Sequence, residues 1–211
     1  MTRHPINTMK GFIFDLDGTL VTSNLDFRYL RTLLDCPIDQ DILHFIADLP
    51  SPEQEHANKI VLDYELKDAR NSLWIEGAKQ LIYALHQKQF PIAIVTRNSK
   101  QATALKLANN HVLFDVILTR EDAPPKPDPS ALLRIAEHWQ IPAPQLAYVG
   151  DYLYDIQAAK NAGMLACLYA PNEAPDYARE ADWIFNHFTQ LKDLISTVRE
   201  PLATSEANRL D

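Results

Sequence analysis

A short apolar run near the N-terminus ends abruptly in charged and polar residues. Residues 11–19 read Gly-Phe-Ile-Phe-Asp-Leu-Asp-Gly-Thr. Residues 12–14 suit a central parallel strand that is covered on both faces, and Gly18 allows a sharp turn after it. Asp15 and Asp17, two residues apart in an extended segment, would point the same way into the crevice where open α/β sheets bind ligands. This stretch predicts an α/β fold with its chemistry at the end of the first strand.

Two explanations fit the paired carboxylates Asp15 and Asp17. Like charges this close at the end of an apolar strand are costly unless a positive group neutralises them, and a divalent cation is a simple candidate. A solvated turn at a strand end would explain the same residues, because Asp-Gly is common in turns. On this stretch alone, the two explanations carry similar weight.

Three further polar segments each follow an apolar, strand-like run. They are Thr96-Arg97-Asn98-Ser99 after 91–95, Pro124-Pro125-Lys126-Pro127-Asp128-Pro129 after 115–118, and Gly150-Asp151-Tyr152-Leu153-Tyr154-Asp155 after 146–149. In this order, the four segments resemble the motifs of the haloacid dehalogenase-like hydrolase superfamily, most of whose members are magnesium-dependent phosphatases. The resemblance runs from about Gly11 to about Phe185. The first segment is the most specific, and the order of all four strengthens the others.

The rest of the chain alternates between strand-like and helix-like segments. Strands are expected at 12–14, 92–96, 116–118, 147–149, 165–169 and, more weakly, 183–185. A helix is expected over 77–87, and another after Asn98 or Ser99, with Ala102, Leu105 and Ala108 facing the sheet. Alternating elements with short connections predict a Rossmann-like parallel sheet with right-handed crossovers.

The interval between the first two strands is too long for one crossover helix. It contains three helical patterns, at 25–34, 40–49 and 53–70, and no convincing strand. We interpret residues 23–75 as an inserted helical cap, 1–22 and 76–200 as the core, and 201–211 as a flexible tail. The resemblance supports this division, because the first cap type of the superfamily is inserted at the same place. A rigidly packed helical subdomain with no gating role would explain the same pattern.

Composition and charge favour a soluble enzyme. The 211 residues can bury a core for one catalytic domain with an insertion, and a net charge of −8 without a basic stripe argues against nucleic-acid binding. Cys36 and Cys167 lack metal-type spacing, which favours a reduced, cytoplasmic chain. Neither a signal peptide nor a membrane span is expected. The positive charge that binds an anionic substrate must therefore come from a few local residues.

The chemistry of a phosphate monoester gives the four segments their expected roles. A nucleophile must attack in line, cations must neutralise the phosphate oxygens, and the leaving oxygen must be protonated. The resemblance implies that Asp15 is the nucleophile, forming an aspartyl phosphate, and that Asp17 is the general acid. Dehalogenases of the superfamily lack this acid, so Asp17 favours a phosphatase. Thr96 would hold a phosphate oxygen, and Lys126, kept in extended backbone by flanking prolines, would offset the charge on Asp15 and the phosphate.

The resemblance also implies a magnesium site. Asp15, the backbone carbonyl of Asp17, and Asp151 would supply the protein ligands. Asp155 would lie behind them and hold Lys126 or a metal-bound water. Tyr152 and Tyr154 are bulkier than the residues expected between these two acids. The candidate substrate-binding residues are Gly18, Thr19, Thr96, Arg97, Asn98 and Lys126.

The predicted function is magnesium-dependent hydrolysis of a small soluble phosphate monoester. The cap placement and the Lys-Pro-Asp-Pro loop most resemble the phosphoglycolate-phosphatase-like branch of the superfamily. One alternative is a phosphomutase of the β-phosphoglucomutase kind, which returns the phosphoryl group to a sugar. Another is a catalytically silent binding protein on this fold. Neither the substrate, the cap residues that select it, nor the oligomeric state follows from the sequence.

Overall fold

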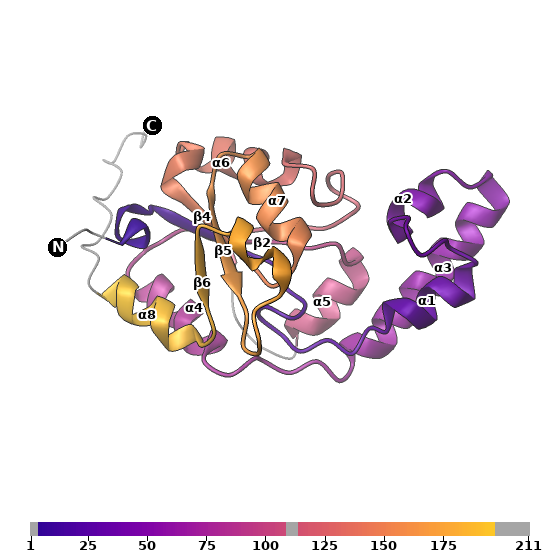
Figure 1. The fold of residues 1–211 in the computed structure, drawn as a ribbon, viewed down its shortest axis with the longest axis horizontal. Helices are drawn as coiled ribbons and strands as arrows, with labels where there is room; N and C mark the ends of the chain where they lie inside the picture. The colour runs from indigo at the N-terminus through magenta and orange to yellow at the C-terminus, as the bar shows by residue number, and fades with distance from the viewer. Residues whose placement is uncertain (1–3, 109–113, 197–211) are drawn as a thin grey trace, which may run out of the picture.

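Six parallel strands form one sheet in the order β3-β2-β1-β4-β5-β6 within the residues that the structure describes (Figure 1). The structure is a computed structural model that describes residues 4–108 and 114–196. The strands are β1 (Gly11–Phe14), β2 (Ile92–Val95), β3 (Val116–Leu118), β4 (Leu146–Gly150), β5 (Leu165–Tyr169) and β6 (Trp183–Phe185). The parallel pairing of every neighbouring strand confirms the predicted Rossmann-like α/β core.

The register of the sheet aligns the ends of its three central strands. Phe14 at the end of β1 pairs with Ile94 of β2 on one side and with Val149 of β4 on the other. All residues of these three strands are buried, as their continuous apolar sequences predict. The residues that follow the strands therefore emerge together at one edge of the sheet.

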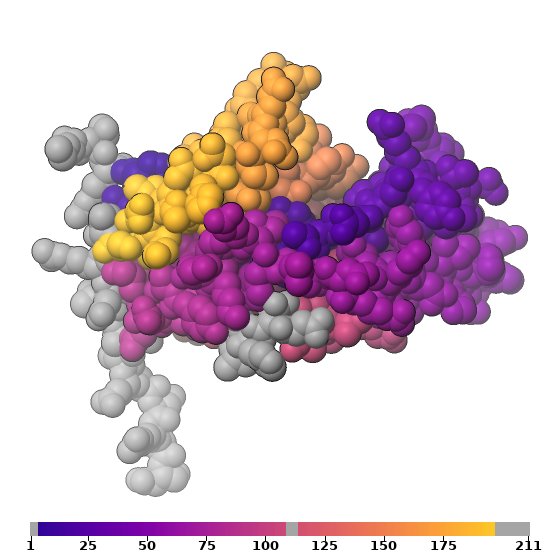
Figure 2. All heavy atoms as spheres, turned by 90° about the horizontal axis from the view of Figure 1, so that it is seen from below, coloured from indigo at the N-terminus to yellow at the C-terminus, as the bar shows by residue number. Residues whose placement is uncertain are grey.

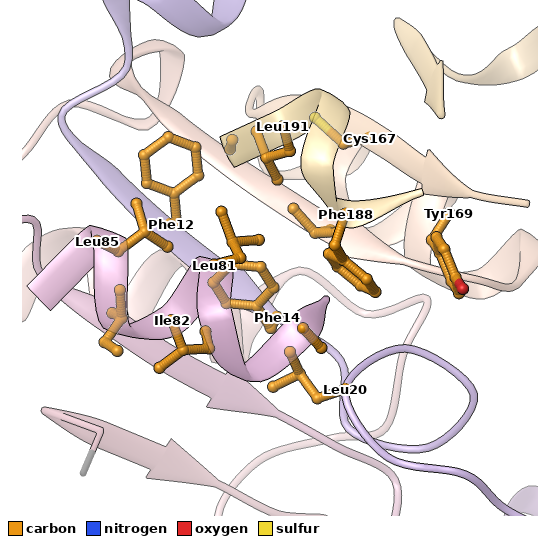
Figure 3. Packing of buried hydrophobic residues seen from close by; sticks show 14 of the residues in the cluster. Phe12, Phe14, Leu20, Leu81, Ile82, Leu85, Cys167, Tyr169, Phe188 and Leu191 are labelled. Carbon is orange, nitrogen blue, oxygen red and sulfur yellow. The ribbon is translucent and has the colours of Figure 1, made fainter. Parts of the chain in front are cut away.

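Helices cover both faces of the sheet. The helices α4 (Ala78–Gln87) and α8 (Phe188–Ser196) pack on one face, and α6 (Ser130–Trp139) and α7 (Leu153–Asn161) on the other (Figure 1). Phe12 and Phe14 point toward α4 and α8, where Leu81 and Phe188 meet them (Figure 3). Ile13 lies in the cluster on the opposite face. Because side chains alternate along a strand, β1 anchors both halves of the core.

Three helices lie between β1 and α4 and form a lobe of their own. They are α1 (Phe27–Leu34), α2 (Ile42–Ala47) and α3 (Ser51–Ala69). The side chains of Asp26 and Asp41 cap the first two of these helices by accepting backbone N–H bonds. The lobe has a separate hydrophobic cluster, which includes Leu30, Ile46 and Val61. In Figure 2 its indigo and purple atoms project beyond the core on one side.

The two segments that connect the lobe to the core run beside each other. Val21 bridges Trp74 in antiparallel fashion, Thr22 N–H donates to Leu73 O (2.8 Å), and Ile75 N–H donates to Leu20 O (2.9 Å). We call residues 23–75 the cap. The boundaries between cap and core stay a prediction, which the separate cluster and the paired connections support. The expected tail at 201–211 lies outside the described residues.

The helix α5 (Lys100–Ala108) packs between the core and cap helix α3. Ser99 caps it, as expected, by accepting the N–H of Ala102. The predicted sheet-facing set is wrong in part, because Ala108 is exposed and Leu105 is only half-buried. The buried side chains of α5 are Ala102, Thr103 and Lys106. Because α5 also packs against α3 of the cap, the face that it buries differs from the one that periodicity predicted.

Short 3-10 helices complete the described fold. They are η1 (Pro5–Thr8), η2 (Ala143–Gln145) and η3 (Asp176–Glu180). Across the part of the chain that the structure describes, no helix combines the length and apolar character needed to cross a bilayer.

Candidate active site

Three strand ends bring the predicted polar residues to one edge of the sheet. Asp15 follows β1, Thr96 follows β2, and Asp151 follows β4. The N–H of Asp15 donates to Val149 O (2.8 Å), so the backbone of this residue continues the β1–β4 ladder. A crevice at the carboxyl ends of parallel strands is the usual ligand site of such sheets.

The ammonium group of Lys126 lies at the centre of the site. Its Nζ donates to Asp15 Oδ1 (2.5 Å), Asp155 Oδ1 (2.7 Å) and Tyr148 Oη (2.8 Å), and lies 3.2 Å from Val95 O. Only 4% of Lys126 is exposed to solvent. A buried ammonium is tolerated when carboxylates and other acceptors surround it, as they do here.

The loop before α6 delivers Lys126 to this position. The sequence predicted an extended backbone for this proline-rich loop. Lys126 and Pro127 lie instead in a turn, in which Asp128 N–H donates to Pro125 O (3.2 Å), and the peptide between Lys126 and Pro127 is cis. The carbonyl of Lys126 also accepts a hydrogen bond from Arg97 Nη1 (2.6 Å). The loop is therefore tied to the residue after Thr96.

Three carboxylates gather beside this ammonium. Oxygen atoms of Asp15, Asp151 and Asp155 lie within 4.8 Å of one another. Thr19 Oγ1 donates to Asp151 Oδ1 (2.9 Å), which fixes the orientation of that carboxylate. Asp155 Oδ1 accepts from Lys126 and Tyr148, and its Oδ2 accepts from the N–H of Tyr152 (2.9 Å). Because both of its oxygens already accept hydrogen bonds, Asp155 is suited to anchoring Lys126.

Two glycines make room for these carboxylates. Gly18 has φ +75°, and a Cβ there would lie 2.4 Å from Asp151 Oδ2. A Cβ at Gly150 would lie 2.3 Å from the Asp155 carboxyl carbon. A Cβ atom does not approach non-bonded atoms this closely, so a larger residue at either position would displace an acidic side chain. The predicted ligand-binding role of Gly18 stays a prediction, which this close approach to Asp151 supports.

Burial and mutual repulsion perturb the acids of this cluster. Burial raises the pKa of Asp15 well above its usual range; Lys126 opposes the shift, and Asp155 and Asp151 add to it. Burial and the nearby Asp155 raise the pKa of Asp151 to about 7. Burial disfavours the Lys126 ammonium, but Asp15 and Asp155 raise its pKa above the ordinary value. The cluster thus has more negative charge than one lysine balances.

The donor set of this cluster fits a divalent cation. Three carboxylates face one ammonium, and a doubly charged ion would offset the remaining repulsion. Carboxylate oxygens are the protein ligands that hard cations prefer. The predicted metal ligands Asp15, Asp17 and Asp151 stay a prediction. The close approach of Asp15 and Asp151 supports it, and Asp17 would contribute only its backbone carbonyl.

The side chain of Asp17 has different partners from that of Asp15. Its Oδ1 accepts from the ammonium of Lys106 and its Oδ2 from the amide of Asn98. Burial raises the pKa of Asp17, and Lys106 opposes the shift. A divalent cation was one of two explanations for the paired carboxylates, and the structure adds a separate lysine partner for each, Lys126 for Asp15 and Lys106 for Asp17.

The segment after β2 forms hydrogen bonds within itself and an ion pair with the cap. Thr96 is 5% exposed, and its Oγ1 accepts from the N–H of Asn98 (3.1 Å). Arg97 pairs with Asp41 of the cap (2.5 Å) and lies over the ring of Tyr154, 4.9 Å from its centre. Of the candidate substrate-binding residues, Asn98 contacts Asp17, Thr19 contacts Asp151, and Arg97 bridges core and cap. Their roles toward a substrate stay predictions.

Sequence reasoning missed two residues of the site. Tyr148 interrupts the aliphatic run of β4, and its hydroxyl lies between Lys126 and Asp155. A tyrosine hydroxyl in a buried strand needs a polar partner, and this requirement could have identified Tyr148 as a site residue. Lys106 lies four residues after the buried Ala102, on the same side of α5. A charged residue on the expected buried face of a helix could have identified Lys106 in the same way.

A parallel α/β sheet with buried carboxylates and a lysine at its strand ends defines an enzyme-like site. Residues 25–168 match the protein family described as haloacid dehalogenase-like hydrolase. Since this match spans more than half of the chain, the chain belongs to that family, and the predicted family resemblance is confirmed. The match begins after Asp17, so the assignment of Asp15 and Asp17 rests on their sequence motif and on the geometry of the site.

Relatives and solved structures agree with this assignment. The chain is 29% identical to a haloacid dehalogenase-like hydrolase domain-containing protein of Arabidopsis thaliana, over 93% of this chain and 88% of the relative. It is 33% identical to a phosphoglycolate phosphatase of Nitrosospira multiformis, over 90% and 80% of the two chains. A crystal structure of a predicted phosphoglycolate phosphatase from Haemophilus somnus shares the fold, with a TM-score of 0.70, 22% identity, and coverage of 89% and 98%.

Proposed function

We propose that this chain is a magnesium-dependent phosphatase that hydrolyses a small soluble phosphate monoester through an aspartyl phosphate on Asp15. The observation that carries the proposal is the buried contact of Lys126 with both Asp15 and Asp155, beside Asp151 and at the end of β1. The similarity to a phosphatase in Nitrosospira multiformis supports the same class of substrate. A cytoplasmic location belongs to this proposal, and the two buried, unpaired cysteines support it.

The chain supplies each group that a two-step hydrolysis needs. An oxygen of Asp15 attacks phosphorus, the bond to the leaving oxygen breaks, and Asp17 gives that oxygen its proton. A water molecule then attacks the phosphoenzyme, Asp17 takes its proton, and phosphate leaves Asp15. Lys126 holds Asp15 Oδ1, which leaves Oδ2 to act as the nucleophile. Lys126 and Thr96 would stabilise charge on the phosphate oxygens.

Magnesium would be held by Asp15, Asp151 and the backbone carbonyl of Asp17. When bound, it would supply positive charge to the phosphate oxygens and to the crowded carboxylates. Asp155 would keep Lys126 in place from behind.

The decisive experiment measures phosphate release from a panel of phosphorylated metabolites and from p-nitrophenyl phosphate. Release from both kinds of substrate in the presence of magnesium is expected. Absence of release from every compound would favour the binding-protein alternative. Activity that depends on a sugar bisphosphate, with transfer to a sugar in place of water, would favour the phosphomutase.

Phosphatase activity should differ between magnesium and calcium. Asp15 must offer one oxygen to the metal and keep the other free for phosphorus, which suits a small octahedral ion. Calcium has longer bonds and readily accepts a carboxylate through both oxygens, so it should occupy the nucleophilic oxygen. We expect activity with magnesium, none after chelation, and competitive inhibition by calcium in a phosphate-release assay. Full activity in excess chelator, or with calcium alone, would contradict the shared-carboxylate site.

Replacing Asp17 by Asn should affect substrates according to their leaving groups. Alkoxides need a proton to leave, whereas p-nitrophenolate does not, so an alkyl phosphate should lose about 100-fold or more in kcat/KM and the aryl phosphate far less. Parallel steady-state measurements on the two substrates provide the comparison. Equal losses for both would remove the acid role from Asp17.

A further inference from the structure

Lys106 is a fully buried lysine at the junction of cap and core. It has 0% exposed surface and extends from α5, which packs against cap helix α3. Its ammonium contacts two carboxylates, Asp17 of the core and Asp68 of the cap, the latter at 2.7 Å. Burial disfavours the charged form, but these two acids raise the pKa of Lys106 above its ordinary value. A buried cation is thus shared between the proposed general acid and the cap.

Asp68 in turn ties the cap helix to the first connecting segment. Its Oδ2 accepts from Ser23 Oγ (3.1 Å) and its Oδ1 from the N–H of Asn24 (2.7 Å). Asp68 lies in the last turn of α3, just before the second connecting segment begins. One carboxylate therefore joins the end of α3 to the first connecting segment and to the ammonium of Lys106. Any displacement of the end of α3 must change the surroundings of that ammonium.

We propose that Lys106 is a positioning residue that couples the orientation of Asp17 to the position of the cap through Asp68. This inference rests on the proposed role of Asp17 as general acid. The Asp17 side chain is held by two donors, Lys106 on one oxygen and Asn98 on the other. The Lys106 ammonium that orients Asp17 Oδ1 also binds Asp68 of the cap. Asp17 is therefore aligned for proton transfer when the cap is positioned so that Asp68 contacts Lys106. In this role Lys106 acts through Asp17, whose Oδ1 accepts a hydrogen bond from its ammonium.

The chain contains a matched control for this contact. Glu65 lies one turn earlier on α3, is 5% exposed, and pairs with the core cation Arg120. Its Oε2 also accepts the N–H of Ser99 (3.2 Å). Glu65 and Asp68 thus both join α3 to a cation of the core, but only the cation bound to Asp68 also contacts Asp17. Weakened cap docking alone would affect variants at both positions alike.

The test compares the leaving-group preference of Lys106→Met, Asp68→Asn and Glu65→Gln with that of Asp17→Asn. The measured quantity is kcat/KM for the best alkyl phosphate divided by kcat/KM for p-nitrophenyl phosphate. We expect this ratio to fall about tenfold in Lys106→Met, because proton transfer to a poor leaving group depends on the alignment of the acid. It should fall less in Asp68→Asn and stay at the wild-type value in Glu65→Gln. Circular dichroism melting curves verify that each variant is folded.

A double variant sharpens the result. Asp17→Asn combined with Lys106→Met should have the same ratio as Asp17→Asn alone, because Lys106 acts through Asp17. If Lys106→Met does not fold, the contrast between Asp68→Asn and Glu65→Gln decides. Two outcomes would contradict the coupling without affecting the phosphatase mechanism. One is a wild-type kcat/KM ratio in both Lys106→Met and Asp68→Asn. The other is an equal fall of the ratio in Asp68→Asn and Glu65→Gln. A wild-type ratio in Asp17→Asn would remove the general acid, and with it both the proposed mechanism and the coupling.

Discussion

Replacing Asp15 by Asn is expected to lower turnover roughly 10⁴-fold or more, because removing a catalytic nucleophile eliminates the covalent step. The amide cannot attack phosphorus and is a poorer metal ligand than the carboxylate. Steady-state phosphate release with magnesium measures the loss. Asp193→Asn, an exposed carboxylate on α8, is the matched control and should retain wild-type turnover. Turnover of Asp15→Asn near the wild-type rate would exclude Asp15 as the nucleophile.

The same substitution should leave the fold intact. Burial, with Asp155 and Asp151, raises the pKa of Asp15 despite the nearby Lys126. A raised carboxyl pKa means that ionised Asp15 lowers stability at neutral pH, so an uncharged amide should not lower the melting temperature in metal-free buffer. Lys126 keeps Asp155 as its partner in this variant. A large drop in melting temperature would show instead that the Asp15–Lys126 pair stabilises the fold.

Replacing Lys126 by Met should reduce both stability and activity. The substitution leaves the buried Asp15 and Asp155 facing each other without a cation, and the loss of one partner from a buried ion pair costs about 3 to 5 kcal/mol in unfolding free energy. Chemical denaturation in metal-free buffer measures this term. Without the ammonium, turnover should fall about 10²- to 10³-fold, as when one group that stabilises the transition state is removed. Binding of vanadate or fluoride complexes should weaken as well.

A second lysine in the chain provides the control. Lys160 pairs with Asp182, but 44% of its side chain is exposed, so Lys160→Met should change stability and activity far less. Unchanged unfolding free energy and unchanged inhibitor binding in Lys126→Met would mean that the buried contacts of Lys126 do not hold the site together.

Local sequence patterns were enough to predict the parallel core. The apolar runs of β1, β2 and β4 are buried on both faces, and such runs can be recognised without tertiary information. The order of the motifs also predicted that Asp15, Lys126, Asp151 and Asp155 would meet. The carboxyl ends of neighbouring parallel strands share one edge of the sheet, so residues that follow such strands converge there. The contacts of Lys126 with Asp15 and Asp155 agree with that expectation.

Only the tertiary structure decided which partner each charged group takes. Asp15 and Asp17 are two residues apart, but one is paired with Lys126 and the other with Lys106. Periodicity placed Ala108 on the inner face of α5, whereas packing against the cap buried Lys106. A lysine in a helix is normally solvated, and the free energy that permits its burial comes from carboxylates distant in sequence. Such pairings depend on how the cap and core meet, which no local pattern encodes.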